Sequence, residues 1–227
     1  MTIQPVQAPC VICGGAEFAP GPLGRVSGRG YRPRCMSCRA LERHRIVRQI
    51  YDALPDDLIG ASDLLQFSPD NGAPHDRFKS VEFSVFGGDN NLNLMDIDRP
   101  DGRYDWVIAN HVLEHVSDDR KALAEMLRVV RDSGIVQISI PSPCSALETI
   151  ELEPPVPDIS GHWREYGSDF PLIMAPVLQG VRGLSIAERD RSTDTWDVCY
   201  FFSRSPDTIR RVGQALLKAR IPTLRCV

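Results

Sequence analysis

The spacing of apolar side chains divides the chain into alternating strands and helices. Short apolar runs predict buried strands at 63–68, 79–86, 104–109, 135–140, 183–188 and 197–203, with a weaker one at 91–97. Apolar positions at helical spacing predict helices at 39–54 and 118–132, the second ending at Gly134 as its C′ residue, and Ser205-Pro206 starts a last helix. This alternation indicates an α/β fold with a mostly parallel sheet covered on both faces.

Composition and charge add a second module to this picture. The chain of 227 residues is 42% hydrophobic and 25% charged, as is typical of a globular protein. Residues 1–50 contain eight Arg, no Lys and two Glu, so they carry +6 while the remainder carries −10. That asymmetry predicts a module boundary near residues 50–60. We expect a cytoplasmic protein without membrane contact, because the sequence has neither a long apolar run nor a signal-like N-terminus.

Four cysteines give the first module its chemistry. Cys10 and Cys13 form one CxxC pair, Cys35 and Cys38 form another, and 21 residues separate the pairs. Each pair can lie on a tight turn that directs both sulfurs at one point, which predicts a tetrahedral zinc site rather than two disulfides. A site closed by four thiolates has no open position, so the zinc is expected to be structural. Three other cysteines are expected to stay free: Cys144, Cys199 and Cys226.

The arginines around these cysteines allow two interpretations. They can form a basic surface for nucleic acid, or they can offset the negative charge of a zinc ion held by four thiolates. Only Phe18 and Tyr31 are aromatic in this region, which gives little support for base stacking. We therefore favour charge compensation over nucleic-acid binding. His44 is expected on the following helix and not as a fifth metal ligand.

The stretch 105–119 carries the main candidate chemistry. A short buried strand runs into a polar turn that contains Asn110, His111, Glu114 and His115, and a helix follows. Ligands of open α/β sheets bind where strands end in this way. The sequence here contains an Asp, a few apolar residues, His-Val-Leu-Glu-His-Val and then paired acids. This pattern resembles class I S-adenosylmethionine-dependent methyltransferases of the type 11 kind. A strand-to-helix turn with an Asp cap is the plainer alternative.

Two further stretches resemble a zinc-ribbon subgroup of the same enzymes. One is Cys35-Met-Ser-Cys-Arg-Ala-Leu-Glu-Arg-His-Arg45, and the other is His162-Trp-Arg-Glu-Tyr-Gly-Ser-Asp-Phe170. The resemblance implies a Rossmann-like methyltransferase sheet, mostly parallel with the last strand antiparallel, and a small N-terminal zinc ribbon. It divides the chain into a ribbon at 1–45, a linker helix at 46–60 and a methyltransferase-like domain at 61–227, with a lid insertion at 141–182.

The resemblance also implies S-adenosylmethionine as cofactor, in a loop that departs from the family pattern. Gln66 stands where an acidic residue is usual, and Ser68 and Asp70 replace two glycines, so that only Gly72 remains. Asp96 matches the Asp that faces the adenine amine. The expected cofactor-binding residues are Gln66, Phe67, Ser68, Asp70, Gly72, Asp96, Ile97, Asn110 and His111.

The segment 141–182 is proline-rich and shows no clear strand, and it follows the fifth predicted strand at the ligand edge of the sheet. A long irregular stretch in such a place is usually functional. We expect a lid over the cofactor, with His162, Arg164 and Tyr166 facing the acceptor, although packing of the lid alone is an equal alternative. The candidate catalytic residues are His111, His115, His162 and Tyr166, with the histidines as proton acceptors.

These features favour methyl transfer from S-adenosylmethionine to a small-molecule, sugar or peptide acceptor, most simply on oxygen or nitrogen. Two alternatives stay open at this point. The altered loop at 66–71 suits a catalytically inactive, methyltransferase-like binding protein, and the arginine-rich module suits a methyltransferase that associates with nucleic acid. A monomer and a homodimer are both compatible with the sequence.

Overall fold

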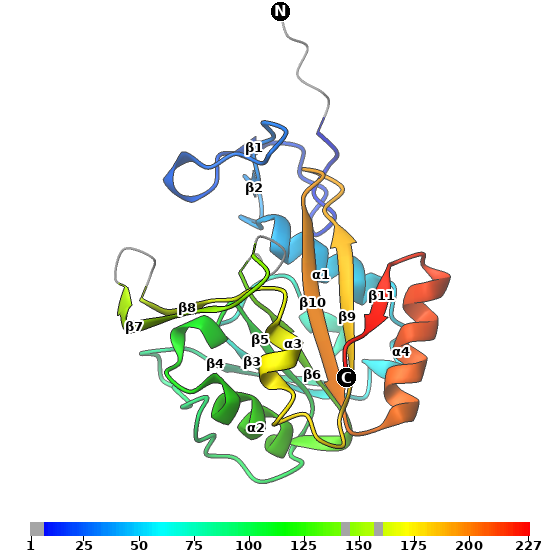
Figure 1. Ribbon diagram of the computed structural model, residues 1–227. Coiled ribbons are helices and arrows are strands. Elements are labelled where there is room, and N and C mark those ends of the chain that lie inside the picture. Colours follow the sequence, from blue (N-terminus) through cyan, green and yellow to red (C-terminus); the bar gives the residue numbers. More distant parts are fainter. Residues whose placement is uncertain (1–6, 142–145, 157–160) are drawn as a thin grey trace, which may run out of the picture.

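A seven-stranded sheet organises the chain. The computed structural model describes residues 7–141, 146–156 and 161–227. The order across the sheet is β11-β9-β10-β6-β5-β3-β4 (Figure 1). The strands are β3 (Asp63–Phe67), β4 (Ser80–Ser84), β5 (Tyr104–Asn110), β6 (Val130–Ser139), β9 (Arg182–Arg189), β10 (Trp196–Ser203) and β11 (Thr223–Arg225).

Strand direction confirms the expected fold class. Neighbours β4, β3, β5 and β6 pair in parallel, whereas β10 runs antiparallel to β6, and β9 and β11 each pair antiparallel. The result is a Rossmann-like α/β sheet of the methyltransferase type, with late antiparallel strands. Because four parallel strands share one edge, their carboxyl ends place the loops after β3, β4 and β5 side by side.

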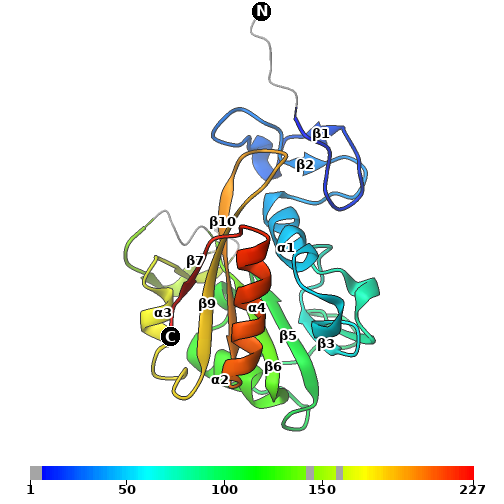
Figure 2. The ribbon, with the colours of Figure 1, turned by 90° about the vertical axis from the view of Figure 1, so that its right-hand side faces the viewer.

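Helices cover both faces of this sheet, as the hydrophobic pattern predicts. On one face α2 (Asp119–Val129) and α3 (Phe170–Met174) bury Leu123, Met126 and Phe170 in the larger core. On the other face α1 (Glu42–Asp52) and α4 (Pro206–Lys218) bury residues such as Ile50 and Val212 (Figure 2). No helix in the described ranges has the length and apolar character of a membrane span.

The prediction of a weak third strand at 91–97 is wrong. This segment is irregular apart from an isolated bridge between Asn93 and Asp96. Side chains occupy the backbone donors that a strand would use: Ser84 Oγ accepts from the Leu92 amide at 3.0 Å, and Asn93 Oδ1 accepts from the Met95 amide at 3.0 Å. Local side-chain bonds of this kind compete with strand pairing.

The role expected for Gly134 is also wrong. Helix α2 ends at Val129, and Gly134 lies inside β6 rather than behind a helix. A Cβ atom there would come within 2.5 Å of the Asp105 carbonyl oxygen. The glycine is therefore needed for the close approach of β5 to β6.

The lid segment contains strands that its sequence did not suggest. A hairpin of β7 (Ile150–Val156) and β8 (His162–Glu165) precedes α3, with Ile150 opposite Glu165 (Figure 1). The two ranges 142–145 and 157–160 fall outside the described residues. The free thiol expected at Cys144 belongs to the first of them.

The N-terminal module is built around a two-stranded ladder. Strands β1 (Phe18–Ala19) and β2 (Arg34–Cys35) pair antiparallel, and short 3-10 turns lie at Pro22–Gly24 and, after α1, at Asp56–Leu58. Helix α1 then carries the chain into the sheet. Its Arg45 is fully buried and forms a two-point ion pair with Asp190, with nitrogen–oxygen distances of 2.7 and 2.9 Å. This pair fastens the module to the β9–β10 connection.

Candidate active site and cysteine centre

The four predicted cysteines converge. Sulfur atoms of Cys10 and Cys38 lie 3.7 Å apart, those of Cys13 and Cys35 lie 3.5 Å apart, and all four fall within 4.8 Å of one another. A tetrahedral zinc ion with sulfur at about 2.3 Å requires sulfur–sulfur distances of about 3.8 Å. The donor set and its spacing fit a four-thiolate zinc site. Cys199 and Cys226 are free thiols elsewhere, as expected.

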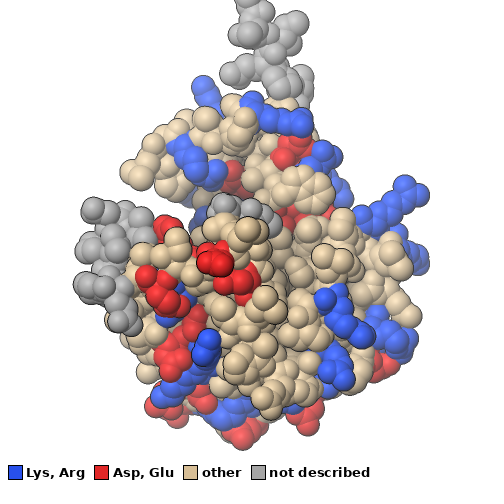
Figure 3. Space-filling view, viewed as in Figure 1, with Lys and Arg blue, Asp and Glu red and all other residues tan. Residues whose placement is uncertain are grey.

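Much of the arginine charge in this module is used internally. Arg25 pairs with Glu42 at 2.8 Å and Arg29 pairs with Asp194 at 2.6 Å, in addition to the buried pair of Arg45. Figure 3 shows the remaining basic side chains spread over the ribbon rather than gathered in one stripe. The distribution favours charge compensation and docking of the module.

The ribbon also fixes the loop after β3. Arg48 donates to the carbonyl oxygens of Asn71, Gly72 and Ala73 at 3.1–3.3 Å. The Asn71 amide in turn donates to the Cys38 carbonyl at 2.9 Å. Ser68 adopts a left-handed backbone with φ 53°, the conformation that glycine takes readily. Contacts from α1 and from the Cys38 carbonyl thus hold the part of this loop at 71–73.

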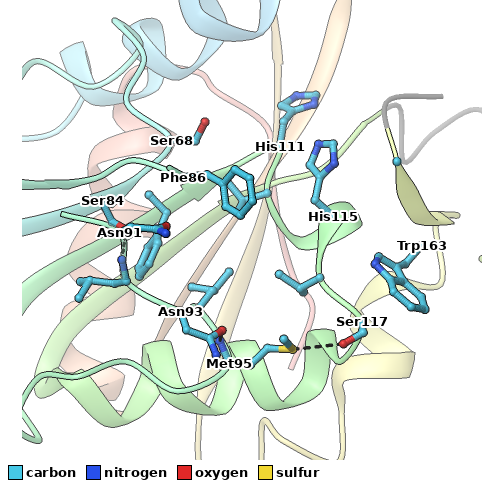
Figure 4. A pocket seen from close by; sticks show the side chains of 16 residues that line it. Ser68, Ser84, Phe86, Asn91, Asn93, Met95, His111, His115, Ser117 and Trp163 are labelled. Carbon is cyan, nitrogen blue, oxygen red and sulfur yellow. Dashed lines mark hydrogen bonds between the residues drawn. The ribbon is translucent and has the colours of Figure 1, made fainter. Parts of the chain in front are cut away.

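A cavity opens at the carboxyl ends of β3, β4 and β5. It has a volume of about 720 Å³. Apolar walls come from Phe67, Phe86 and Met95, and polar groups include Ser68 and Asn93 (Figure 4). The remaining lining residues are Ser84, Asn91, Leu92, Leu94, His111, Val112, His115, Val116, Ser117, Gly161 and Trp163.

The expected cofactor residues divide into two groups. Phe67, Ser68 and His111 line this cavity. Asp96 is exposed to solvent and Ile97 is buried in the core, where its amide donates to Glu125 at 2.8 Å. The wall at this point comes from their neighbours Asn93, Leu94 and Met95.

Gln66, Asp70, Gly72 and Asn110 have structural contacts. Gln66 is buried and its oxygen lies 2.7 Å from His75 Nε2. Gly72 packs on α1, where a Cβ would come within 3.1 Å of Val47. Asp70 accepts from the Gly72 amide at 2.6 Å and from the Asn110 amide at 3.1 Å. Asp70 and Asn110 line another cavity beside Cys38 and His44. That cavity shares Ser68 and His111 with the main one, whose lining includes neither Asp70 nor Asn110.

A buried polar network behind Asn110 was not predicted. Asn110 Oδ1 accepts from Gln137 and from Ser139, the latter at 2.9 Å, and Gln137 accepts from the Tyr51 hydroxyl at 3.2 Å. The sequence signal was present, since Gln137 and Ser139 interrupt an apolar strand at alternate positions. The network fixes the end of β5 from which the next side chains project.

His111 and Glu114 form the turn after β5. His111 has a left-handed backbone with φ 53°, and burial lowers the pKa of its imidazole to about 3. Glu114, in the 3-10 turn η4 (Leu113–His115), is 1% exposed, and burial raises the pKa of its carboxyl to about 7. His111 Nε2 and Glu114 Oε2 have no hydrogen-bond partner within the described ranges. Strained backbone and unsatisfied buried polar atoms are typical of functional sites.

A second cavity, of about 500 Å³, meets the first at His111 and His115. His115 and His162 both line it, with ring centroids 4.7 Å apart at 81°. Arg43 and Asp197 also line it, and neither residue was predicted. Burial raises the pKa of Asp197 to about 6 and lowers that of His162 below its usual value. Figure 4 shows the rings of His111 and His115 pointing in the same direction, away from Met95.

The expectation that Arg164 and Tyr166 face the acceptor is wrong. Arg164 is buried and donates to the carbonyl oxygens of Leu113, Val116 and Ser117 at 2.7–3.1 Å. Tyr166 is buried in the larger core, and its hydroxyl donates to Asp119 at 2.7 Å. Arg164 attaches the lid to the turn that carries the histidines, and Tyr166 attaches it to the first residue of α2. Arg164 lines a different cavity, beside Asp119 and Glu151. Of the expected trio only His162 lines one of the cavities at the histidine turn, while Trp163, next to it, lines the main one.

Residues 83–138 match the profile of a family described as "Methyltransferase domain". The resemblance inferred from the sequence is confirmed. This matched segment contains β5, the histidine turn, α2 and most of β6. No curated protein matches the chain.

The solved structures that match the chain include methyltransferases, at low identity and with TM-scores below 0.5. An S-adenosylmethionine-dependent methyltransferase from Thermotoga maritima is 9% identical, with a TM-score of 0.42 over 71% of this chain and 91% of that one. The 1,6-didemethyltoxoflavin-N1-methyltransferase of Burkholderia thailandensis, solved with S-adenosylhomocysteine, is 14% identical, with a TM-score of 0.43 over 70% and 78%. A methyltransferase from Aquifex aeolicus is 13% identical, with a TM-score of 0.40 over 68% and 89%.

Proposed function

We propose that the protein transfers a methyl group from S-adenosylmethionine to oxygen or nitrogen of a small-molecule, sugar or peptide acceptor. One observation carries this proposal. The cavity of about 720 Å³ at the ends of β3, β4 and β5 joins a second cavity at His111 and His115. Two adjoining cavities provide room for a cofactor and an acceptor on either side of the transferred group.

The larger cavity is the proposed cofactor site. Phe67, Phe86 and Met95 offer apolar surface for the adenine ring, while Ser68 and Asn93 offer polar atoms for the ribose and the amino-acid part. Phe67, Ser68 and His111 remain from the expected contact set, and Leu94 and Met95 replace Asp96 and Ile97. Two hydrogen bonds speak for the active enzyme over the inactive alternative, since the Asp70 carboxylate accepts from the side-chain amide of Asn110 and from the Gly72 amide.

The smaller cavity is the proposed acceptor site. The bound cofactor supplies an electrophilic methyl group, so the protein mainly has to align the acceptor and exclude water. His162 has a pKa below the usual value, so its imidazole is neutral at pH 7 and can accept a proton from a hydroxyl or an ammonium group. S-adenosylmethionine, when bound, would supply the methyl carbon and keep the electron pair of the broken carbon–sulfur bond on sulfur.

The cysteine centre is the proposed site of one structural zinc ion, bound by Cys10, Cys13, Cys35 and Cys38. Its thiolates require reducing conditions, which is consistent with a cytoplasmic location. A nucleic-acid partner is not part of this proposal, because Arg25, Arg29 and Arg45 are engaged by acidic side chains of the protein itself.

Calorimetry with S-adenosylhomocysteine tests the cofactor site. Asn91 is exposed and lines the main cavity, whereas Asp98 is exposed beyond the wall. Asn91→Trp fills the cavity and is expected to weaken binding at least about tenfold, or 1.4 kcal/mol. The matched Asp98→Trp should leave affinity unchanged. Equal affinities for the two variants, or no binding by the wild-type chain, would contradict the proposal.

A further inference from the structure

Three side chains with metal-binding atoms meet at the junction of the two cavities. Glu114 and His115 come from η4, and His162 comes from β8 on the lid. One ligand atom of each lies within 4.8 Å of the other two. Arg164 joins these elements, since it belongs to β8 and donates to three carbonyl oxygens of the η4 turn. The approach of the three side chains is therefore fixed by the fold.

The Glu114 carboxylate is buried with few hydrogen-bond donors: its own backbone amide acts on it, and one of its two oxygens has no partner among the described residues. Its Oε1 atom lies 3.6 Å from His111 Nδ1 and 4.0 Å from His115 Nε2, and its Oε2 atom has no partner in the described part of the chain. A buried carboxylate that lacks hydrogen bonds is costly unless a cation or a proton neutralises it. The carboxylate faces a cavity that has three imidazoles in its wall, those of His111, His115 and His162.

The other charges in this wall balance one another. Arg25 is held by both oxygens of Glu42 at 2.8 Å. Arg43 and Asp197 contribute one positive and one negative side chain to the same wall. Glu114 is the remaining acidic group among the described lining residues, so a cation beside it meets an excess of negative charge.

We propose that Glu114, His115 and His162 bind a divalent first-row transition metal ion, at a site separate from the cysteine centre. Two imidazole nitrogens and one carboxylate oxygen form a donor set that suits such ions and leaves coordination positions open. Ligand atoms around an occupied site lie about 3–3.5 Å apart, so the three groups must move together slightly. His115, whose side chain is 40% exposed, has the freedom to do so.

The open positions face the proposed acceptor cavity. An acceptor hydroxyl bound there would lose its proton more readily, and the two imidazoles would then act as metal ligands rather than as proton acceptors. This role rests on the proposed methyl transfer. Binding of the metal does not, because it is measured without cofactor or acceptor.

Cobalt provides the test, in the full-length chain after elemental analysis has established its zinc content. Titration with Co²⁺ should show one additional site, with ligand-field absorption and without the intense charge-transfer bands of cobalt thiolates. Glu114→Gln, which keeps the shape of the side chain, and His162→Ala, on the lid, should each weaken this binding at least about tenfold. His75→Gln removes a histidine that contacts Gln66 outside the cluster and should leave it unchanged.

Several results would overturn the metal site. They are the absence of a second binding event, equal weakening by His75→Gln, and thiolate bands that reveal exchange of cobalt into the cysteine centre. If Glu114→Gln does not fold, His162→Ala decides the question, because that side chain is only half-buried on the lid. Loss of cobalt binding with normal S-adenosylhomocysteine binding separates this inference from the proposed function.

Discussion

Two buried charged clusters in this protein differ in how completely their polar atoms are satisfied. In the first, the Arg45 guanidinium donates to both oxygens of Asp190 and to the carbonyls of Pro33 and Ala40. Asp190 also accepts from the Thr193 hydroxyl at 2.6 Å. In the second, Glu114 and His111 each keep a buried atom without a partner in the described residues.

The satisfied cluster stabilises the fold, whereas the unsatisfied cluster has atoms available for a ligand. A buried ion pair with every atom bonded holds one arrangement and has nothing left for a ligand. An unsatisfied group at the same depth costs stability, and a bound ligand or ion can recover that cost. Burial alone would have assigned the same role to Arg45, Arg164 and Glu114, whereas the hydrogen bonds separate the first two from the third.

The largest effect is expected at the cysteine centre. Cys35→Ser should release zinc and unfold the ribbon, since metal binding and folding are coupled in such modules. The loop at 68–72 should then loosen, because Cys38 and Arg48 no longer hold it, and affinity for S-adenosylhomocysteine should fall about tenfold or more. Elemental analysis and calorimetry measure the two effects, with Cys226→Ser as the control. Retention of zinc by Cys35→Ser would rule out the four-thiolate site.

The next effect concerns the satisfied cluster. Asp190→Asn leaves the Arg45 charge buried and unpaired, which should lower the free energy of unfolding by about 3–5 kcal/mol. Asp57→Asn breaks an exposed pair with Arg211 and should cost less than about 1 kcal/mol. Urea denaturation of both variants measures the contrast. Similar losses in the two would show that the buried pair does not fasten the ribbon.

Asp197, beside the unsatisfied cluster, should show an opposite and pH-dependent effect. Its pKa is about 6 in the folded chain, above the 3.8 of an aspartate in water, so the folded state holds the proton more tightly. Below pH 4 the carboxyl is protonated in both states, whereas stability is lost as the pH rises through 6. Asp197→Asn should therefore raise the free energy of unfolding by about 1–3 kcal/mol at pH 8 and change it little at pH 4. Denaturation at the two pH values tests this, and a gain that is the same at both would contradict it.

The smallest effect separates Tyr166 from the catalytic candidates. Tyr166→Phe removes the hydroxyl that donates to Asp119 and should lower the free energy of unfolding by about 1–2 kcal/mol. Binding of S-adenosylhomocysteine should not change, because the hydroxyl lies in the core. Reduced cofactor affinity in a stably folded Tyr166→Phe protein would contradict this prediction and show that Tyr166 contributes to the binding site.

The sequence predicted what depends on local pattern. Apolar periodicity located α1, α2 and the strands β3, β5 and β10, and cysteine spacing located the metal centre, because these signals lie within a few residues. The prediction of a strand at 91–97 failed because the side chains of Ser84 and Asn93 accept hydrogen bonds from backbone amides that a strand would use for pairing.

The site was predicted where one turn carries it and missed where distant segments meet. His111, Glu114 and His115 lie in a single motif, so their proximity follows from the chain itself. Arg43 and Asp197 come from α1 and β10, and only the docked ribbon brings them to that turn. Arg164 and Tyr166 have the residue types of a binding site, but their partners are backbone carbonyls and Asp119, which no local pattern reveals.

The Arg45–Asp190 pair also sets an order of events during synthesis. Its two residues are 145 positions apart, so the ribbon leaves the ribosome long before its anchor exists. At roughly 5–20 residues per second the interval is about 7–30 seconds. Throughout it, the charged face of α1 lacks its partner, and the ribbon depends on its metal alone. A nascent chain without zinc is therefore exposed to misfolding during this interval, until the β9–β10 connection has been synthesised.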